Sequence, residues 1–309
     1  MSENGTSAHA ASARPSALAR FFLTPTDGSA AALLRVFLGL IAGWQSLGIW
    51  LNLDRYWGPS GMIPFEFVSR DPFIRVSVLA WAPESFALLQ LVAALFSLAA
   101  VALLLGLQPR IAALVLAYLH ISLQHRNPFI LNAGDRLFAI VVALATLMPL
   151  ASRYSFDGWL RAKRGLAARS GTVWGQRLVG LQIAWVYLAS VIEKLAYARW
   201  REGVALREVL ASPLLTEWPI EVNSKPLLWL MTYGTLLFET AFPLAIWWKR
   251  ARPYLIAAGI VFHVSIDILM TIPIFSYLMI SCYAVYLSDA EANALVERCA
   301  RLFKRKSAP

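Results

Sequence analysis

The chain has few residues that carry charge or form covalent links. Only 15% of its 309 residues are charged, while 59% are hydrophobic, which excludes an ordinary soluble domain. Its two cysteines, Cys282 and Cys299, lie in an apolar stretch and near the C-terminal end, so they support neither a disulfide framework nor a thiolate metal site. The four histidines show no His-x-x-x-His or Glu-x-x-His spacing, so we expect no metal.

Long apolar runs and 12 tryptophans are present instead. Runs of this length are typical of helices that cross a bilayer. We therefore predict an all-α fold, a polytopic membrane bundle of about eight transmembrane helices. The expected spans are residues 30–51, 86–107, 110–125, 136–151, 178–198, 227–248, 253–271 and 273–288.

The net charge of +10 is concentrated in short loops and near the C-terminal end, which is not the footprint of a nucleic-acid-binding protein. Eight spans place both ends on one side of the membrane, and that side carries roughly twice as many lysines and arginines as the other. The distribution predicts a bacterial inner-membrane protein with both termini in the cytoplasm. We expect a disordered tail at residues 1–20, a membrane domain at 21–290, and a basic C-terminal helix and tail at 291–309, with the helix beginning near Asp289.

One predicted span carries a lysine near its end. The stretch from residue 182 to 203 reads QIAWVYLASVIEKLAYARWREG, and Gln182, Ser190 and Lys194 share one helical stripe in it. A charged amine in hydrocarbon costs a few kcal/mol, so such a residue is a functional-site hypothesis by default. The structural alternative is that Lys194 extends its ammonium to the headgroups.

Other predicted spans also contain polar groups. His263 and Asp267 are four residues apart, a spacing at which the carboxylate fixes the orientation of the imidazole. Arg35 and Glu239 are expected to form a structural buried ion pair. Together with His120, these residues predict a shared polar cavity.

The predicted orientation brings Lys194, Arg126 and Asp135 to the extracytoplasmic side. The loop at residues 52–85 lies there too, and its aromatic, glycine and proline residues suit a lid. We therefore expect one extracytoplasmic-facing pocket lined by these three residues, by His263 and by this loop.

Four segments resemble a known family. ASVIEKLAYARWREG resembles the lysine-bearing segment of the vitamin K-dependent gamma-glutamyl carboxylases, in which a Lys-Leu pair precedes a Trp and a Gly. FHVSIDILMTIPIFSYLMIS resembles the Phe-His and Phe-Ser-Tyr-x-Met pattern of the same proteins. RNPFILNAGDRLF and RYSFDGWL are similar to bacterial members of the wider group, the HTTM domain. The resemblance covers roughly residues 30–290.

The resemblance implies a membrane enzyme in which Lys194 is the base that deprotonates reduced vitamin K or menaquinol. The base must be a neutral amine, and an apolar site disfavours the charged form. The carboxylases have an Asn-Asn-His stretch where this chain has Asn132, Ala133, Gly134 and Asp135, so that histidine is either missing or replaced by Asp135. We assign catalysis to Lys194, His263 and Asp135. The residues expected to bind quinol are Arg126, Asn132, Trp200, Tyr277 and His120.

The carboxylases continue into a large luminal domain that holds the propeptide of the substrate, whereas this sequence ends soon after the eighth predicted span. We therefore do not expect propeptide recruitment. Other short bacterial members resemble a peptide-toxin maturation protein, so one alternative is a membrane factor that matures or exports a secreted peptide without carboxylation, with a partner subunit. Another is a non-enzymatic scaffold or transporter, although no inverted repeat is evident.

Overall fold

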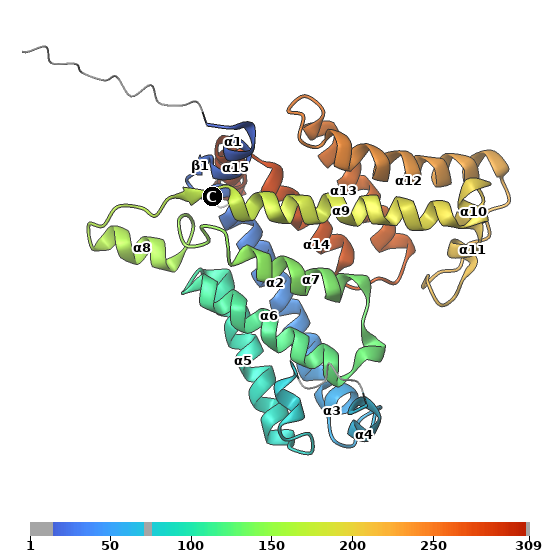
Figure 1. Cartoon of the computed structure of the whole chain (residues 1–309), viewed down its shortest axis with the longest axis horizontal. Coiled ribbons are helices and arrows are strands. Elements are labelled where there is room, and N and C mark those ends of the chain that lie inside the picture. The colour runs from blue at the N-terminus through green and yellow to red at the C-terminus, as the bar shows by residue number, and fades with distance from the viewer. Residues whose placement is uncertain (1–14, 71–75, 307–309) are drawn as a thin grey trace, which may run out of the picture.

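The computed structural model describes residues 15–70 and 76–306, the last four of them by backbone alone. The regular structure is almost entirely helical (Figure 1). In chain order, the elements are α1 (Ala17–Leu23), β1 (Pro25–Thr26), α2 (Ser29–Leu51), α3 (Leu53–Trp57), α4 (Phe65–Val68), the 3-10 helix η2 (Val78–Ala80), α5 (Phe86–Leu105), α6 (Pro109–Arg126), the 3-10 helix η3 (Pro128–Ile130), α7 (Ala133–Ala145), α8 (Phe156–Lys163), β2 (Gly171–Thr172), α9 (Trp174–Ala196), α10 (Ala198–Arg201), α11 (Ala205–Ala211), α12 (Lys225–Ala245), α13 (Arg252–Leu269), α14 (Phe275–Cys282), the 3-10 helix η4 (Tyr283–Tyr286) and α15 (Asp289–Lys306).

Five of the described helices are long and apolar enough to cross a membrane, namely α2, α5, α9, α12 and α13. The chain is therefore a multi-pass membrane protein, but the predicted count of eight spans is not confirmed. α7 has only 13 residues, a rise of about 20 Å, which falls short of a hydrocarbon core of about 30 Å. The apolar helix made by α14 and η4 ends at Tyr286 and is also below spanning length.

The helices pack in two groups that meet at α7, α14 and η4. α2 packs against α5, α5 against α6 and α6 against α7, whereas α9 packs against α12, which it follows side by side in Figure 1. α14 contacts α2, α7, α9 and α13. The core at this junction is apolar and includes Leu38, Phe138, Ile183 and Leu278.

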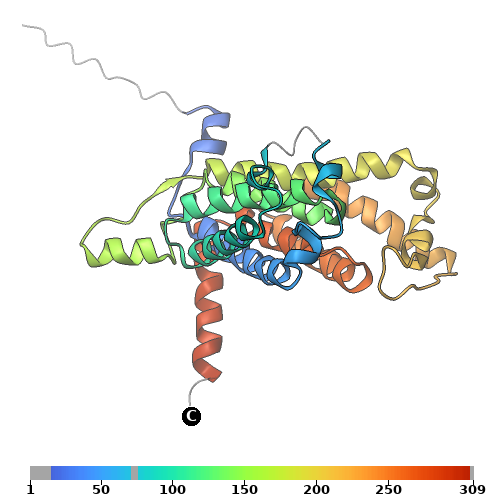
Figure 2. The same ribbon diagram turned by 90° about the horizontal axis from the view of Figure 1, so that it is seen from below.

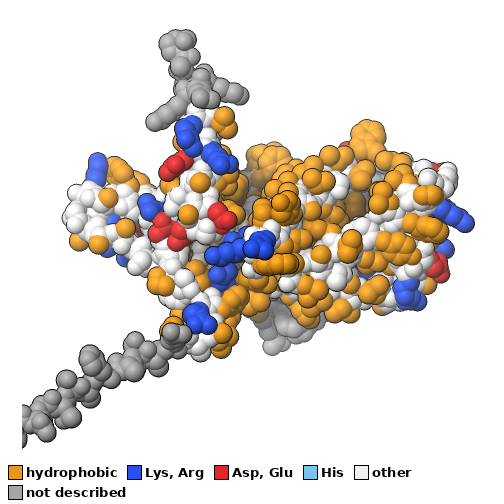
Figure 3. Space-filling view, turned by 90° about the horizontal axis from the view of Figure 1, so that it is seen from above, with side chains coloured by type: hydrophobic (Ala, Val, Ile, Leu, Met, Phe, Trp, Pro, Cys, Tyr) orange, Lys and Arg blue, Asp and Glu red, His pale blue; other side chains and the backbone are white. Residues whose placement is uncertain are grey.

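Large apolar side chains cover the outside of the bundle, as the space-filling view in Figure 3 shows. Trp44, Leu98, Leu237 and Val261 each expose between 65% and 71% of their area. An exposed apolar surface of this kind is costly in water and is what hydrocarbon chains cover in a membrane.

The two described ends of the chain lie at one end of the bundle, where α1 contacts α9 and α15 contacts α2. The predicted C-terminal helix is present as α15, which extends away from the other helices in Figure 2. The predicted boundary of the N-terminal tail at residue 20 falls inside α1, and residues 1–14 of that tail lie outside the described residues. Both ends therefore sit opposite α10 and α11 (Figure 1).

Candidate functional site

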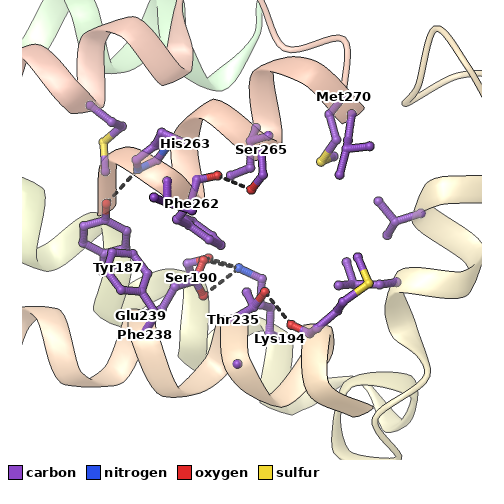
Figure 4. A pocket seen from close by; sticks show the side chains of 18 of the residues that line it. Tyr187, Ser190, Lys194, Thr235, Phe238, Glu239, Phe262, His263, Ser265 and Met270 are labelled. Atoms are coloured by element: carbon purple, nitrogen blue, oxygen red, sulfur yellow. Dashed lines mark hydrogen bonds and ion pairs between the residues drawn. The ribbon is translucent and has the colours of Figure 1, made fainter. Parts of the chain in front are cut away.

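A cavity lies between α9, α12, α13 and α14, and α11 closes one side of it. Its volume is about 660 Å³. Most of its wall is apolar, and polar side chains gather on one part of it (Figure 4). The apolar wall includes Val186, Phe238, Phe262, Ile266, Phe275 and Met279.

Lys194 lies on this wall, in the last turn of α9. Its Nζ lies 2.5 Å from Oε1 and 2.7 Å from Oε2 of Glu239 on α12, and it donates a 2.5 Å hydrogen bond to Oγ of Ser190. Ser190 in turn donates to Oε1 of Glu239 at 3.2 Å. The predicted stripe therefore directs Ser190 and Lys194 to the same place, and the amine points into the bundle (Figure 4).

The Lys194 and Glu239 side chains form an ion pair with little access to solvent. The Lys194 side chain is 20% exposed and that of Glu239 is 5% exposed. The ring of Trp200 lies 5.0 Å from Nζ of Lys194, close enough for a cation–π contact. Lys194 was predicted to be a neutral amine, whereas in the structure it forms an ion pair with a carboxylate.

His263 lies on α13, lines the same cavity and is 1% exposed. Its Nε2 is 2.7 Å from the hydroxyl of Tyr187, which is itself 2.5 Å from the hydroxyl of Tyr283. Its Nδ1 is buried and has no hydrogen-bond partner among the described residues. The imidazole is thus fixed by a tyrosine of α9, and one ring nitrogen remains available.

The predicted pair of His263 with Asp267 is not formed. Asp267 is exposed near the end of α13 and accepts a 2.6 Å hydrogen bond from the hydroxyl of Tyr277. An exposed carboxylate keeps its contact with water, which burial beside the imidazole would remove. Tyr277, a predicted quinol ligand, is 57% exposed and lines neither described cavity.

The predicted ion pair of Arg35 with Glu239 is also wrong. The guanidinium of Arg35 is fully buried and donates to the backbone carbonyls of Leu103, Leu104 and Tyr154 at 2.7, 2.6 and 2.5 Å. The last carbonyls of a helix have no partner within it and carry partial negative charge. The C-terminal end of α5 therefore takes up the charge of Arg35, which leaves Glu239 to Lys194.

Asp135, Asn132 and His120 lie on a second cavity of about 410 Å³, between α2, α6 and α7. Asn132 caps α7, since its Oδ1 accepts from Gly134 N at 2.7 Å, while Oδ2 of Asp135 accepts from Asn132 N at 3.2 Å. His120 approaches the backbone carbonyl of Asp135 at 3.1 Å through Nε2. The single pocket predicted for Lys194 and Asp135 is thus two cavities that share no lining residue.

Arg126 fixes a loop and lines neither cavity. It is 1% exposed, and its guanidinium donates to the carbonyls of Gly58 at 2.8 Å and Ile63 at 2.9 Å. These contacts hold part of the predicted lid at 52–85, of which residues 71–75 lie outside the described residues. The lid contributes Asn52, Tyr56 and Trp57 to the second cavity and none of its described residues to the first.

Tyr187 and the partnership of Glu239 with Lys194 were not predicted. Tyr187 lies three residues before Ser190 and seven before Lys194, so it falls on the predicted polar stripe, and that periodicity is a signal that finds it. Nothing in the sequence says which helix faces this stripe.

The chain matches one protein family over most of its length. Residues 23–290 match the model of the HTTM domain. The chain belongs to the HTTM-domain family. This confirms the predicted membership and covers all the helices from α2 to α14.

This HTTM-domain protein is 23% identical over 213 residues to the sporulation-delaying protein SdpB of Bacillus subtilis (strain 168). The match covers 65% of this chain and 64% of that relative, so it spans less than two thirds of the relative's length. No solved structure matches the chain.

Proposed function

We propose that this HTTM-domain protein is a membrane enzyme that binds a lipid-soluble quinol in the cavity of Lys194, with the Lys194–Glu239 pair as proton acceptor. The observation that carries the proposal is an apolar cavity of about 660 Å³ whose wall holds this ion pair and His263. A quinol combines an apolar ring and tail with hydroxyl groups, and a mostly apolar pocket with a few convergent polar groups suits such a molecule.

The residues present fit this chemistry. The rings of Phe238 and Phe262, whose centroids are 4.9 Å apart and whose planes are tilted by 41°, offer an apolar surface. The buried Nδ1 of His263 lacks a partner among the described residues, so a ligand hydroxyl would satisfy it. Reduced vitamin K or menaquinol would supply reducing equivalents and acidic hydroxyl groups when bound.

The Lys194–Glu239 pair would act as one unit. It holds one carboxylate and one ammonium, so a proton delivered to Oε1 or Oε2 of Glu239 leaves a neutral acid beside a cation. Lys194 would keep its positive charge near the oxygen that loses the proton, while Ser190 and the ring of Trp200 hold Nζ in place. His263 would orient the ligand through its free nitrogen.

We place this cavity toward the extracytoplasmic side of a bacterial inner membrane. Lys194 lies near the end of α9 that leads into α10, away from α1 and α15 (Figure 1). The distribution of lysine and arginine favours cytoplasmic termini, so the Lys194 end of α9 would face outward.

The test combines binding and turnover of menaquinol by the purified protein in lipid nanodiscs. Gly234 lines the cavity, and a Cβ built on it meets no atom within 4 Å, so Gly234→Leu fills the cavity without a backbone clash. Gly43 has equally open surroundings and lines neither described cavity, which makes Gly43→Leu the matched control. We expect Gly234→Leu to weaken menaquinol binding about tenfold or more and Gly43→Leu to leave it unchanged.

The double variant Lys194→Met with Glu239→Gln removes both charges at once and leaves neither buried alone. With dissolved dioxygen supplied as the two-electron acceptor, we expect it to bind menaquinol but to oxidise it about 100-fold more slowly or worse, the range of a lost general base. Unchanged turnover in this variant, or unchanged binding in Gly234→Leu, would remove the proposal.

A second candidate is a membrane factor that matures or exports a secreted peptide without carboxylation, together with a partner subunit. The similarity to sporulation-delaying protein SdpB favours it. Under this proposal, a peptide encoded beside this gene would be processed in cells that make no quinone, whereas loss of processing in such cells would support the quinol enzyme. Processing that persists in a strain lacking this protein would exclude the second candidate.

A further inference from the structure

We propose that the second cavity, at Asp135, binds a primary ammonium group carried by a small amine or by the amino terminus of a short peptide. This proposal is independent of the quinol proposal, because the two cavities share no lining residue. It depends on four features of the second cavity, which are its hydrogen-bonding groups, its charge, its aromatic wall and its size.

Two glutamines of this cavity donate to Asp135, and one of them leaves its amide oxygen without a donor among the described residues. Gln45 Nε2 donates to Oδ1 of Asp135 at 3.3 Å, and Gln124 Nε2 donates to the Asp135 backbone carbonyl at 3.0 Å. Both glutamines therefore direct an amide nitrogen at Asp135. Oε1 of Gln45 is buried without a hydrogen-bond partner among the described residues. A buried acceptor of this kind calls for a donor.

The cavity contains a carboxylate, Asp135, that forms no ion pair with a lysine or arginine among the described residues. The Asp135 carboxylate accepts from the backbone N and Nδ2 of Asn132 at 3.2 and 2.8 Å and from Gln45, and all of these donors are neutral. The ion pairs made by lysines and arginines in the described chain go to other carboxylates. A carboxylate among membrane helices is expensive unless a cation accompanies it.

Three aromatic side chains form part of the wall of the second cavity. Trp44, Tyr56 and Trp57 line the cavity, and the faces of such rings attract organic cations. The volume of about 410 Å³ is far larger than a bare metal ion fills, and it leaves room for the carbon skeleton of an amine or for the first residues of a peptide. The ligand class is therefore an organic ammonium rather than an inorganic cation.

A strained turn separates this cavity from the first one. Pro273 and Ile274 line the second cavity, whereas Ile272 and Phe275 line the cavity of Lys194. Ile274 has a φ of 57°, a left-handed conformation that is unusual for a β-branched residue. Strain of this kind persists where the surrounding structure requires it, and here it holds the partition between the two cavities.

The experiment measures binding of three probes to the full-length protein in maltoside detergent, which contributes no amine. The probes are propylamine, trialanine amide with a free amino terminus, and the N-acetylated form of that peptide. We expect at least one free amine to raise the melting temperature and to bind in calorimetry, and the acetylated peptide to do neither. Binding of propylamine alone identifies a small amine, and binding of the free peptide identifies an amino terminus.

Variants locate the site. A Cβ on Gly48 meets no atom within 4 Å, and Gly48 lines the second cavity, so Gly48→Leu fills it without touching the cap of α7. We expect Gly48→Leu and Asp135→Asn each to weaken amine binding about tenfold or more, and Gly43→Leu on the same helix to leave it unchanged. If Asp135→Asn fails to fold because the cap of α7 is lost, amine binding by Gly48→Leu alone shows whether the second cavity is the binding site.

Three results would overturn the proposal. They are equal binding of the free and acetylated peptides, amine binding that Gly48→Leu does not weaken, and stabilisation by sodium chloride in the absence of any amine response. Gly234→Leu, which fills the other cavity, serves as the second control, and we expect it to leave amine binding intact. If the protein oxidises menaquinol but binds no amine, only this proposal fails. If it binds an amine but does not oxidise menaquinol, only the proposed function fails.

Discussion

Nζ of Lys194 on α9 and the carboxylate of Glu239 on α12 form an ion pair, with Nζ 2.5 Å from Oε1 and 2.7 Å from Oε2. The pair joins two candidate membrane-spanning helices at the wall of the larger cavity. It compensates the cost of burying either charge and lies next to the space where a ligand would bind. Its energetics are therefore the first property to test.

We expect Lys194→Met to lower the free energy of unfolding by about 3 kcal/mol, because it leaves the buried Glu239 carboxylate without a cation. The double variant with Glu239→Gln should lose less than about 1 kcal/mol, since it removes both charges. Reversible unfolding in mixed detergent measures both values. Arg199→Met is the control, because Arg199 and Glu208 pair at the surface, where the effect should be within about 1 kcal/mol. A double variant as unstable as the single one would mean that the charges are not coupled.

Arg35 and Glu239 should contribute independently to the free energy of unfolding. Arg35→Leu removes the guanidinium that donates to the Leu104 and Tyr154 carbonyls and leaves Leu103 O only its hydrogen bond from Gly106 N, so we expect a loss of about 3 kcal/mol or more. Combined with Glu239→Gln, the two losses should add to within about 0.5 kcal/mol, as they do for residues without shared partners. A coupling energy well above that value would restore the ion pair expected from the sequence.

The nitrogen resonance of the His263 imidazole should change when Tyr187 is substituted and stay unchanged when Asp267 is substituted. Tyr187→Phe removes the hydroxyl 2.7 Å from Nε2, so we expect a changed nitrogen resonance of this imidazole and a loss of about 1 kcal/mol. Asp267→Asn removes the acceptor of Tyr277 and should leave the resonance unchanged. Nitrogen NMR of the histidine-labelled protein makes the comparison, with Tyr277→Phe as the control. A shift in Asp267→Asn equal to that in Tyr187→Phe would contradict the structure.

The attachment of α15 should depend on pH through Asp27, which precedes α2. Partial burial alone would raise the pKa of Asp27, but hydrogen bonds from Ser29, Arg153 and Asn293 together hold it well below its usual value of 3.8. Asn293 belongs to α15 and donates to Oδ2 of Asp27 at 3.3 Å. Because the folded pKa is lower than the unfolded one, the stabilisation is complete above about pH 4 and is lost as the pH falls further.

A nitroxide on Cys299 reports this change, since Cys299 is exposed on α15 while Cys282 is buried. We expect constant mobility of the label from about pH 5 to pH 8 and increasing mobility below about pH 4. In Asp27→Asn the mobility should be raised at every pH, and its dependence on pH should flatten. An unchanged profile in this variant would assign the attachment to other contacts.

Local patterns in the sequence predicted much of the fold because apolar length and helical spacing are properties of one segment at a time. The runs that became α2, α5, α9, α12 and α13 were all expected, as was α15. The predicted count of eight spans is not confirmed, since hydropathy does not mark where turns shorten a helix such as α7. The stripe of Ser190 and Lys194 was likewise visible in the spacing.

The partners of the buried charges were beyond such patterns. Arg35 was expected beside Glu239, yet carbonyls at the end of α5 accept its hydrogen bonds instead. His263 and Asp267 had suitable spacing, but the imidazole contacts Tyr187, whereas the exposed carboxylate accepts from Tyr277. Each of these outcomes depends on which helix lies alongside, and a stripe on one helix contains no information about its neighbour.

The amino-acid sequence by itself determined that the chain is a helical membrane protein of the HTTM-domain family, because composition and periodicity act along the chain. Only the tertiary structure decided that Lys194 meets Glu239 and that Asp135 belongs to a separate cavity. The physical reason is that side-chain pairing is settled by packing between segments distant in sequence, where helix ends, burial and the partition at Ile274 determine which polar groups meet.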